Sequence, residues 1–134
     1  MIVVDTNIIV PLHMTSESTG QVLAVLQKDA TWCTPPLWQS EFLNVLTGCM
    51  RRKSITLDQA RQIMEAALIT MDGSEISVSP WLVLELSLAG SCSAYDCEFV
   101  ALAKELGVKL ITLDEQILAQ FPGTAITPAA FTRE

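Results

Sequence analysis

Four of the fifteen acidic residues, Asp5, Glu41, Asp96 and Asp114, stand among apolar residues rather than in polar stretches. A buried carboxylate is costly unless it is paired or bound to a metal ion. Several carboxylates at one place also repel one another, and they persist together only where positive charge compensates them. Mg²⁺ and Mn²⁺ are hard cations that prefer such oxygen ligands. If the four side chains meet, the chemistry that they support is the binding of a divalent metal ion.

Two of these acids follow predicted strands. Asp5 comes directly after the apolar run at 1–4, and Asp114 comes directly after the sequence KLITL at 109–113. Each acid also has a plain structural explanation, because Asp5 suits the cap of a following helix and residues 112–115 have capping-box spacing. Taken alone, neither acid identifies a functional site.

The other two acids belong to predicted helices. Glu41 lies three residues after Trp38 and four before Val45, so it projects from an apolar helix face. The alternative for Glu41 is an edge position from which its side chain reaches solvent. Asp96 precedes an apolar stripe at helical spacing, and its alternative is a capping box with Ser93. The joint placement of the four acids is therefore a stronger signal than any one of them.

The elements that must position these acids alternate along the chain. Strands are predicted at 1–4, 30–34, 75–79, 109–113 and 125–127. Helices are predicted at 17–28, 37–50, 57–71, 81–89, 93–106 and 114–121. This alternation predicts an α/β fold with a mostly parallel central sheet of about five strands flanked by helices. Ligands of such sheets bind beyond the carboxyl ends of the strands, which is where Asp5 is expected.

Length and hydropathy limit the class of protein. A chain of 134 residues fits a single domain, taken here as 1–134, that can bury a core. Its mean hydropathy of +0.39 predicts strands that are buried on both faces and an apolar contact between subunits. No run is long enough to span a bilayer, and Asp5 and Asn7 interrupt the first apolar stretch, unlike in a signal peptide. We therefore expect a cytoplasmic protein.

Cysteine, histidine and net charge argue against other classes. The four cysteines form no CxxC pair and His13 is the only histidine, so we expect reduced thiols and no zinc site. The net charge of −7 argues against a nucleic-acid-binding protein, because such proteins usually carry a basic surface. This objection weakens if the acidic residues hold divalent cations, since each bound ion offsets part of the negative charge.

Three stretches carry a resemblance to a known family: VVDTNIIV at 3–10, SEFLNVL at 40–46 and SAYDCEFVALAKELGVKLITLDEQIL at 93–118. Over nearly its whole length the sequence resembles the PIN-domain family, and most closely the bacterial VapC-type toxins. The third stretch is the most specific, because it combines a small residue, Tyr-Asp, a helix, Gly, a strand and Thr-x-Asp in that order.

The resemblance implies a PIN-like fold in three layers and the activity of an endoribonuclease that depends on Mg²⁺ or Mn²⁺. It assigns Asp5, Glu41, Asp96 and Asp114 to catalysis and metal binding. Polar residues at positions that often lie beside such a site are Thr6, Asn7, Asn44, Ser93 and Thr112. The resemblance also implies an RNA substrate, a homodimer, and an antitoxin protein whose tail enters the acidic groove.

Three rival interpretations remain weaker or open. A response-regulator receiver needs an acidic pair after the first strand and a Lys after the last, whereas Asp5 stands alone and Lys109 begins its strand. A haloacid-dehalogenase-like phosphatase needs a second Asp where Asn7 stands. A PIN-fold binding protein with weak or no nuclease activity stays open, because the chain has few Lys and Arg residues although its four acids are intact.

Three further features have two interpretations each. The basic run Arg51-Arg52-Lys53 either stabilises the end of a helix through its charge or contacts the phosphates of RNA. Glu98 is either a surface residue or a neighbour of the acidic site, and we favour the surface. His13 is expected to pack at the surface or in a turn rather than to take part in the chemistry.

Overall fold

A parallel sheet of four strands forms the centre of the computed structural model, which describes all residues 1–134. The strands are β1 (Ile2–Val4), β2 (Trp32–Cys33), β3 (Leu110–Ile111) and β4 (Ala125–Ile126). They lie in the order β2-β1-β3-β4, and every neighbouring pair is parallel. The predicted fold class is confirmed, with four strands instead of about five.

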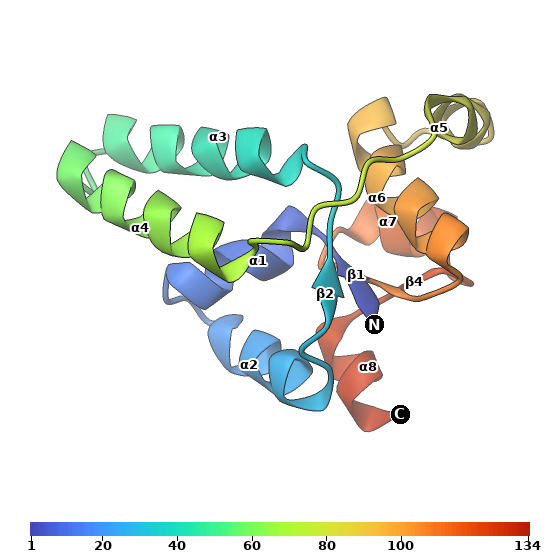
Figure 1. Ribbon diagram of the computed structural model, residues 1–134, viewed down its shortest axis with the longest axis horizontal. Helices are drawn as coiled ribbons and strands as arrows, with labels where there is room; N and C mark the ends of the chain where they lie inside the picture. The colour runs from blue at the N-terminus through green and yellow to red at the C-terminus, as the bar shows by residue number, and fades with distance from the viewer.

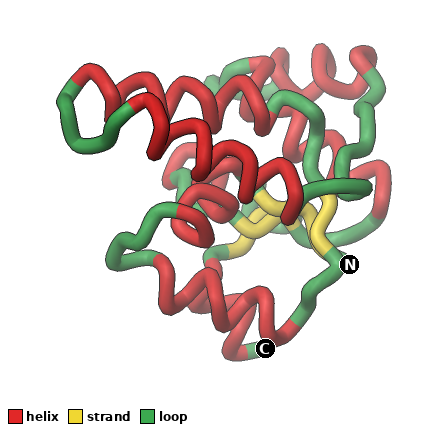
Figure 2. The backbone as a smooth tube through the Cα atoms, turned by 60° about the vertical axis from the view of Figure 1, so that its left-hand side comes forward, coloured by secondary structure: helices red, strands yellow, loops and turns green.

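Helices cover both faces of this sheet, as Figures 1 and 2 show. They are α1 (Thr6–His13), α2 (Thr19–Lys28), α3 (Trp38–Arg51), α4 (Leu57–Thr70), α5 (Pro80–Leu88), α6 (Ala94–Leu106), α7 (Glu115–Gln120) and α8 (Pro128–Arg133). The six predicted helices are confirmed, with ends that differ by at most two residues. None of the eight has the length and apolar composition that a bilayer-spanning helix requires.

Two helices, α1 and α8, were not among the predicted elements. Helix α1 contains Pro11 and several β-branched residues, which weaken a helical pattern in the sequence. Helix α8 has only six residues and starts at Pro128, directly after the last strand. The sequence pattern predicted no element after this strand, whereas the fold continues with α8.

The segment at 75–79 is the predicted strand that does not join the sheet. Its one pairing is an isolated bridge between Glu75 and Thr34. Beyond this bridge the chain turns toward α6, where the backbone N–H of Ser79 donates to the Glu105 carboxylate over 3.0 Å. The segment leaves the sheet edge because its later residues contact α6 instead of β2.

The strands separate two hydrophobic cores. Ile2, Val4 and Ile111 face one core, which includes residues of α1 to α4. Val3 and Leu110 face the other, which includes residues of α5, α6 and α7. Neighbouring residues of a strand point to opposite faces, so an apolar run such as IVV is buried on both sides. This arrangement confirms the expected three layers, and all four cysteines are buried and unpaired within them.

Candidate active site

A groove of about 780 Å³ lies at the carboxyl ends of β1 and β3. Because β2 and β3 flank β1 on opposite sides, the chain changes direction across the sheet at this point. Parallel sheets bind their ligands at such a switch point. Seven of the predicted site residues line the groove: Asp5, Thr6, Asn7, Glu41, Asn44, Asp96 and Asp114.

Asp5 is the most buried of the acids, with 7% of its surface exposed. It caps the N-terminus of α1, because its Oδ1 accepts the backbone N–H of Thr6 over 2.7 Å. Burial raises the pKa of Asp5 from 3.8 to about 7, although the hydrogen bond from Thr112 lowers it, and the charge of Glu41 raises it further. The position of Asp5 is therefore set by the fold, but its negative charge is poorly stabilised.

Two side chains, one from the loop after β3 and one from the first turn of α1, orient the Asp5 carboxylate. The hydroxyl of Thr112 is fully buried and donates to Asp5 Oδ2 over 2.7 Å, and it accepts the backbone N–H of Asp114 over 3.0 Å. Asn7 Nδ2 lies 3.4 Å from Asp5 Oδ2, while Asn7 Oδ1 accepts the N–H of Leu113 over 3.1 Å. These contacts fix the loop after β3, which carries Asp114, against Asp5.

Glu41 approaches the same space from the first turn of α3. Its Oε1 accepts a hydrogen bond of 2.6 Å from the hydroxyl of Thr6. Burial raises the pKa of Glu41, and the charges of Asp96 and Glu98 add to that rise against the effect of the Thr6 hydroxyl. Glu98 is half-buried and does not line the groove, but it lies close enough for its charge to raise the pKa of Glu41.

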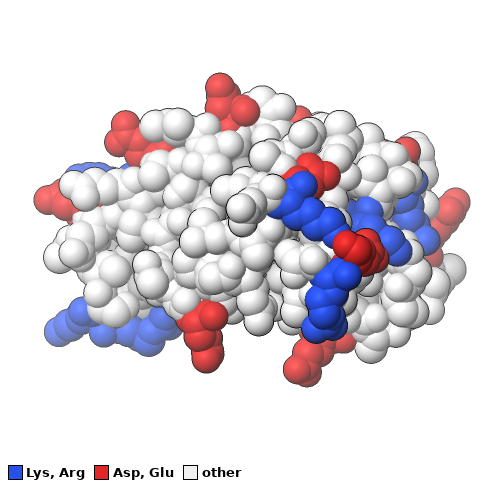
Figure 3. Space-filling model, turned by 90° about the horizontal axis from the view of Figure 1, so that it is seen from below, with Lys and Arg blue, Asp and Glu red and all other residues white.

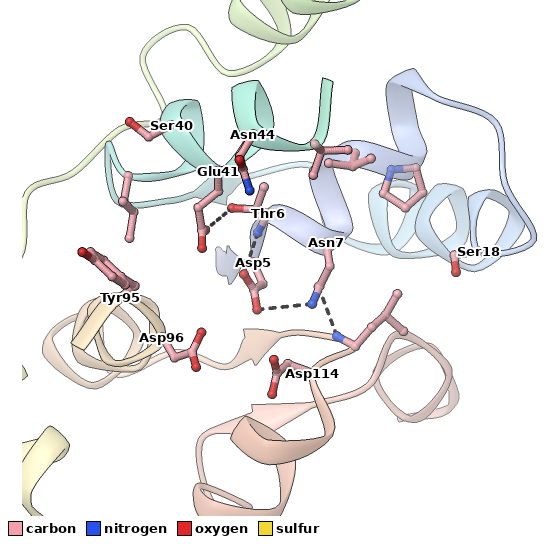
Figure 4. Close-up of a pocket in the computed structure, with 15 residues that line it drawn as sticks. Asp5, Thr6, Asn7, Ser18, Ser40, Glu41, Asn44, Tyr95, Asp96 and Asp114 are labelled. Carbon is pink, nitrogen blue, oxygen red and sulfur yellow. Dashed lines mark hydrogen bonds between the residues drawn. The ribbon is translucent and has the colours of Figure 1, made fainter. Parts of the chain in front are cut away.

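Asp96 and Asp114 complete the acidic cluster from the first turn of α6 and the start of α7. Ser93 caps α6 by accepting the N–H of Asp96 over 3.1 Å, and Asp114 caps α7 by accepting the N–H of Ile117 over 2.9 Å. Burial and the charge of Asp114 raise the pKa of Asp96. Figure 4 shows the Asp5, Glu41, Asp96 and Asp114 carboxylates directed toward one space from four different elements.

No positive charge in the chain compensates these carboxylates. The groove has no Lys or Arg in its lining, and the ion pairs of the structure join the N-terminal amine to Asp29 and Arg61 to Asp58. No three acidic, histidine or cysteine side chains are already arranged as one metal site. Mg²⁺, however, keeps several of its waters and is usually bound through one or two carboxylates. The donor set therefore fits a hard divalent cation.

A comparison with known protein families agrees with this geometry. The family model described as "PIN domain" matches residues 2–123, a range that includes every residue of the groove. The chain belongs to the PIN-domain family.

Two similar proteins agree with this assignment, one in sequence and one in fold. Ribonuclease VapC3 of Pyrobaculum aerophilum is 29% identical over 133 residues, which covers 95% of this chain and 98% of the relative. The crystal structure of PAE2754, also from Pyrobaculum aerophilum, matches with a TM-score of 0.77 and 17% sequence identity. That match covers 98% of this chain and 86% of PAE2754, and at this identity it supports the fold alone.

The other candidate residues of this PIN domain lie outside the groove. Thr112 donates its hydroxyl hydrogen bond to Asp5, and Ser93 caps the N-terminus of α6. His13 packs its ring edge-on against Phe42 with 6.3 Å between ring centroids, which agrees with a packing role.

Some residues of the groove were not among the predicted site residues. Tyr95, which is 63% exposed beside Asp96, lines the groove together with Ser40 and Ser18. Tyr95 was part of the family pattern, but neither its type nor its spacing indicated that it faces the groove. Its exposure next to a carboxylate is a signal that only the structure contains.

Proposed function

We propose that this PIN domain is an endoribonuclease that hydrolyses RNA phosphodiester bonds with the help of Mg²⁺ or Mn²⁺. The observation that carries the proposal is the convergence of Asp5, Glu41, Asp96 and Asp114 in one groove that contains no basic side chain. The similarity to Ribonuclease VapC3 over 95% of the chain supports an RNA substrate. We take residues 1–134 as one functional domain.

In this proposal the acidic residues divide the work. Asp5 and Asp96 bind the cation, and Glu41 and Asp114 complete the site or orient water molecules. When bound, the cation supplies a water of lowered pKa and positive charge beside the phosphoryl oxygens. The chain itself must hold the carboxylates in place, because their negative charges repel one another. Thr112 contributes to this by its hydrogen bond to Asp5.

The hydroxyl of Thr6 and the amide of Asn7 have supporting parts. Thr6 joins two of the acids, since its backbone N–H bonds Asp5 and its hydroxyl bonds Glu41. Asn7 joins the loop after β3 to Asp5. Asn44 lies one turn after Glu41 in the groove wall, where its amide is free to contact the substrate. We infer that these residues orient the carboxylates and the RNA without taking part in proton transfer.

We also propose that the protein is the toxin of a toxin–antitoxin pair. This rests on the resemblance to VapC-type toxins and on the similarity to Ribonuclease VapC3. An antitoxin tail that carries Arg would suit the groove, because a guanidinium binds carboxylates through two parallel hydrogen bonds. Its binding would compete with the cation and the RNA for the same acids.

A homodimer is the expected assembly, and α5 offers a surface for it. Trp81, Leu84 and Leu88 are 72%, 61% and 90% exposed. Their spacing places them on one side of the helix. An exposed apolar face of this kind commonly marks a protein contact, so we propose that two copies meet through α5.

The test of the activity uses the purified protein and a pool of structured RNAs. We expect discrete cleavage with Mg²⁺ or Mn²⁺, none with EDTA, and at least about a hundredfold less with Asp5→Asn, since even neighbours of metal ligands cost ten- to a hundredfold. Asp29→Asn is the matched control, because it removes an acid at the opposite end of the sheet. A folded native protein that binds RNA but cuts none of the pool would favour the alternative of a binding protein.

A further inference from the structure

The basic run of this chain lies on the helix that also forms a wall of the acidic groove. Arg51, Arg52 and Lys53 are exposed at the end of α3, where the chain turns into α4. None of the three belongs to an ion pair. Figure 1 shows α3 and α4 side by side, extending away from the strands, so this end of α3 is distant from the sheet. The one polar contact that these charged groups make within the fold is a weak hydrogen bond of 3.5 Å from Arg52 Nη2 to Cys49 Sγ, so no acidic side chain neutralises them.

The helical repeat connects this end of α3 to the acids. Glu41 lines the groove, and residues 7 and 11 positions later lie two and three turns along the same face of the helix. These residues are Gly48 and Arg52. Their separation along the axis places Arg52 about 16 Å from the level of Glu41, at 1.5 Å per residue. The face that begins at an active-site acid thus ends at an arginine.

Gly48 keeps this face open between the two. A methyl group added to Gly48 would lie 3.1 Å from Nη1 of Arg52, because the guanidinium folds back over the preceding turn. Arg52 therefore directs its charge along the groove side of α3 and not only toward the helix end. A role limited to the helix dipole would not require this direction.

We propose that the RNA substrate leaves the acidic cluster along this face of α3 and that Arg52, assisted by Arg51, binds a phosphate some nucleotides from the cleaved bond. The inference rests on the proposed nuclease function and adds the path of the substrate to it. Apart from the bound cation, the groove offers a polyanion no positive charge, because no Lys or Arg lines it, so RNA gains further attraction only from basic residues along its course. Arginine is suited to this task because its planar guanidinium binds phosphate through two hydrogen bonds.

The test measures how binding and cleavage depend on RNA length. The probes are nested, fluorescently labelled single-stranded oligonucleotides that extend from one mapped cleavage site toward either end, with affinity measured by anisotropy in Mg²⁺. For the native protein we expect affinity to rise about tenfold once an extension on one side reaches the arginines. The variant Arg51→Ala/Arg52→Ala should lose that rise, and its salt slope should fall by about 0.7 for each lost phosphate contact.

Two further variants make the result specific. Lys104→Ala/Arg133→Ala removes the same charge from exposed positions away from the groove and should keep the native length dependence. Arg51→Lys/Arg52→Lys should keep most of the salt slope, because it preserves the charge. The inference is overturned if Lys104→Ala/Arg133→Ala loses the length-dependent rise in affinity as fully as Arg51→Ala/Arg52→Ala does. It is also overturned if Arg51→Ala/Arg52→Ala keeps the native length dependence.

The outcomes also separate the inference from the function on which it rests. If no RNA in the pool is cleaved, the same measurement is made with oligonucleotides of mixed sequence, and an arginine-dependent rise in affinity with length would support the path although the nuclease had failed. Cleavage without any such rise leaves the nuclease standing and refutes the path. If the protein neither cleaves nor binds RNA, both proposals are wrong.

Discussion

The two ends of the central sheet shift the pKa of an aspartate in opposite directions. At the amino ends of the strands, Asp29 accepts a hydrogen bond of 2.7 Å from the N-terminal amine and one of 2.8 Å from the N–H of Thr31. Partial burial raises the pKa of Asp29, but these hydrogen bonds and the charge of the amine outweigh it, so the pKa is lowered overall. At the carboxyl ends, burial and neighbouring acids raise the pKa of Asp5 to about 7.

The difference lies in what each end provides around the carboxylate. The amino end gathers cations: Lys104, Lys109 and the N-terminal amine line a second pocket beside Asp29. Figure 3, seen from below, shows basic side chains next to acidic ones on this side of the molecule. The carboxyl end gathers acids without any basic residue in the groove. A charge that is balanced within the chain stabilises the fold, whereas an unbalanced charge leaves room for a cation from outside.

The largest expected effect concerns the stability of the metal-free protein with Asp5→Asn. A group with a raised pKa in the folded state binds a proton that the unfolded chain releases, so native stability should fall as pH rises from about 4 to 7. The full shift corresponds to about 4 kcal/mol. Asn carries no charge, so the variant should lose most of this pH dependence of stability. The amide group of Asn cannot accept all the hydrogen bonds of the carboxylate, which lowers the stability of the variant at every pH.

Urea unfolding in EDTA at pH 4 and pH 8 measures this effect. The variant should be more stable than the native protein at pH 8, and this advantage should shrink at pH 4. Added Mg²⁺ should stabilise only the native protein at pH 8, because a ligand that binds the folded state raises its stability. Identical pH profiles of stability for the two proteins would show that the charge of Asp5 does not destabilise the folded state.

A smaller effect is expected for Thr112→Val. The substitution removes the hydroxyl that donates to Asp5 and accepts the N–H of Asp114. Loss of a group that orients a metal ligand typically costs ten- to a hundredfold in metal affinity. Isothermal titration with Mn²⁺ measures the change. If Thr112 only stabilises the fold, the metal affinity of the variant will equal that of the native protein.

The matched control for this change is Thr34→Val. Thr34 is also fully buried, and its hydroxyl donates to the backbone carbonyl of Val4 over 3.2 Å on the other side of β1. Both variants remove one buried hydroxyl next to the same strand, so both should lose about 1 kcal/mol of stability. Only Thr112→Val should weaken metal binding, and equal weakening in both would mean that the effect comes from packing.

The part of the site that could be predicted from sequence depends on strand ends. Asp5 and Asp114 follow apolar runs, and in a parallel sheet such positions share one edge. That β1 and β3 are direct neighbours could not be inferred, because strand order depends on contacts between distant segments. Glu41 was indicated by its apolar helix face, but its bond to the Thr6 hydroxyl depends on how α1 and α3 pack.

Two elements differ from the sequence-based prediction because other contacts outweigh their local patterns. The residues at 75–79 alternate like a strand, yet Ser79 bonds to α6 and the segment leaves the sheet. Helix α1 forms despite Pro11, because its N-terminus is capped by Asp5 and its apolar side is buried. In the first case a tertiary contact outweighed the local strand pattern, and in the second a local cap together with burial outweighed the effect of the proline.

The smallest expected effect is that of Asp29→Asn, which completes the comparison between the two ends of the sheet. Because the pKa of Asp29 is lowered in the folded state, its carboxylate contributes stability above its ordinary pKa of 3.8, and this contribution is lost as pH falls through the lower folded value. The ion pair with the amine is partly exposed, so the variant should lose less than about 1 kcal/mol at pH 7.

The sign of this effect is opposite to that of Asp5→Asn. The same urea series should show Asp29→Asn as less stable than the native protein at pH 7 and nearly equal to it in strong acid, with unchanged metal affinity. The same substitution at two ends of one sheet thus removes a stabilising charge in one case and a destabilising one in the other. A gain in stability for Asp29→Asn at pH 7 would contradict the assignment of the amino end as the internally balanced one, because it would mean that the N-terminal amine does not compensate this carboxylate.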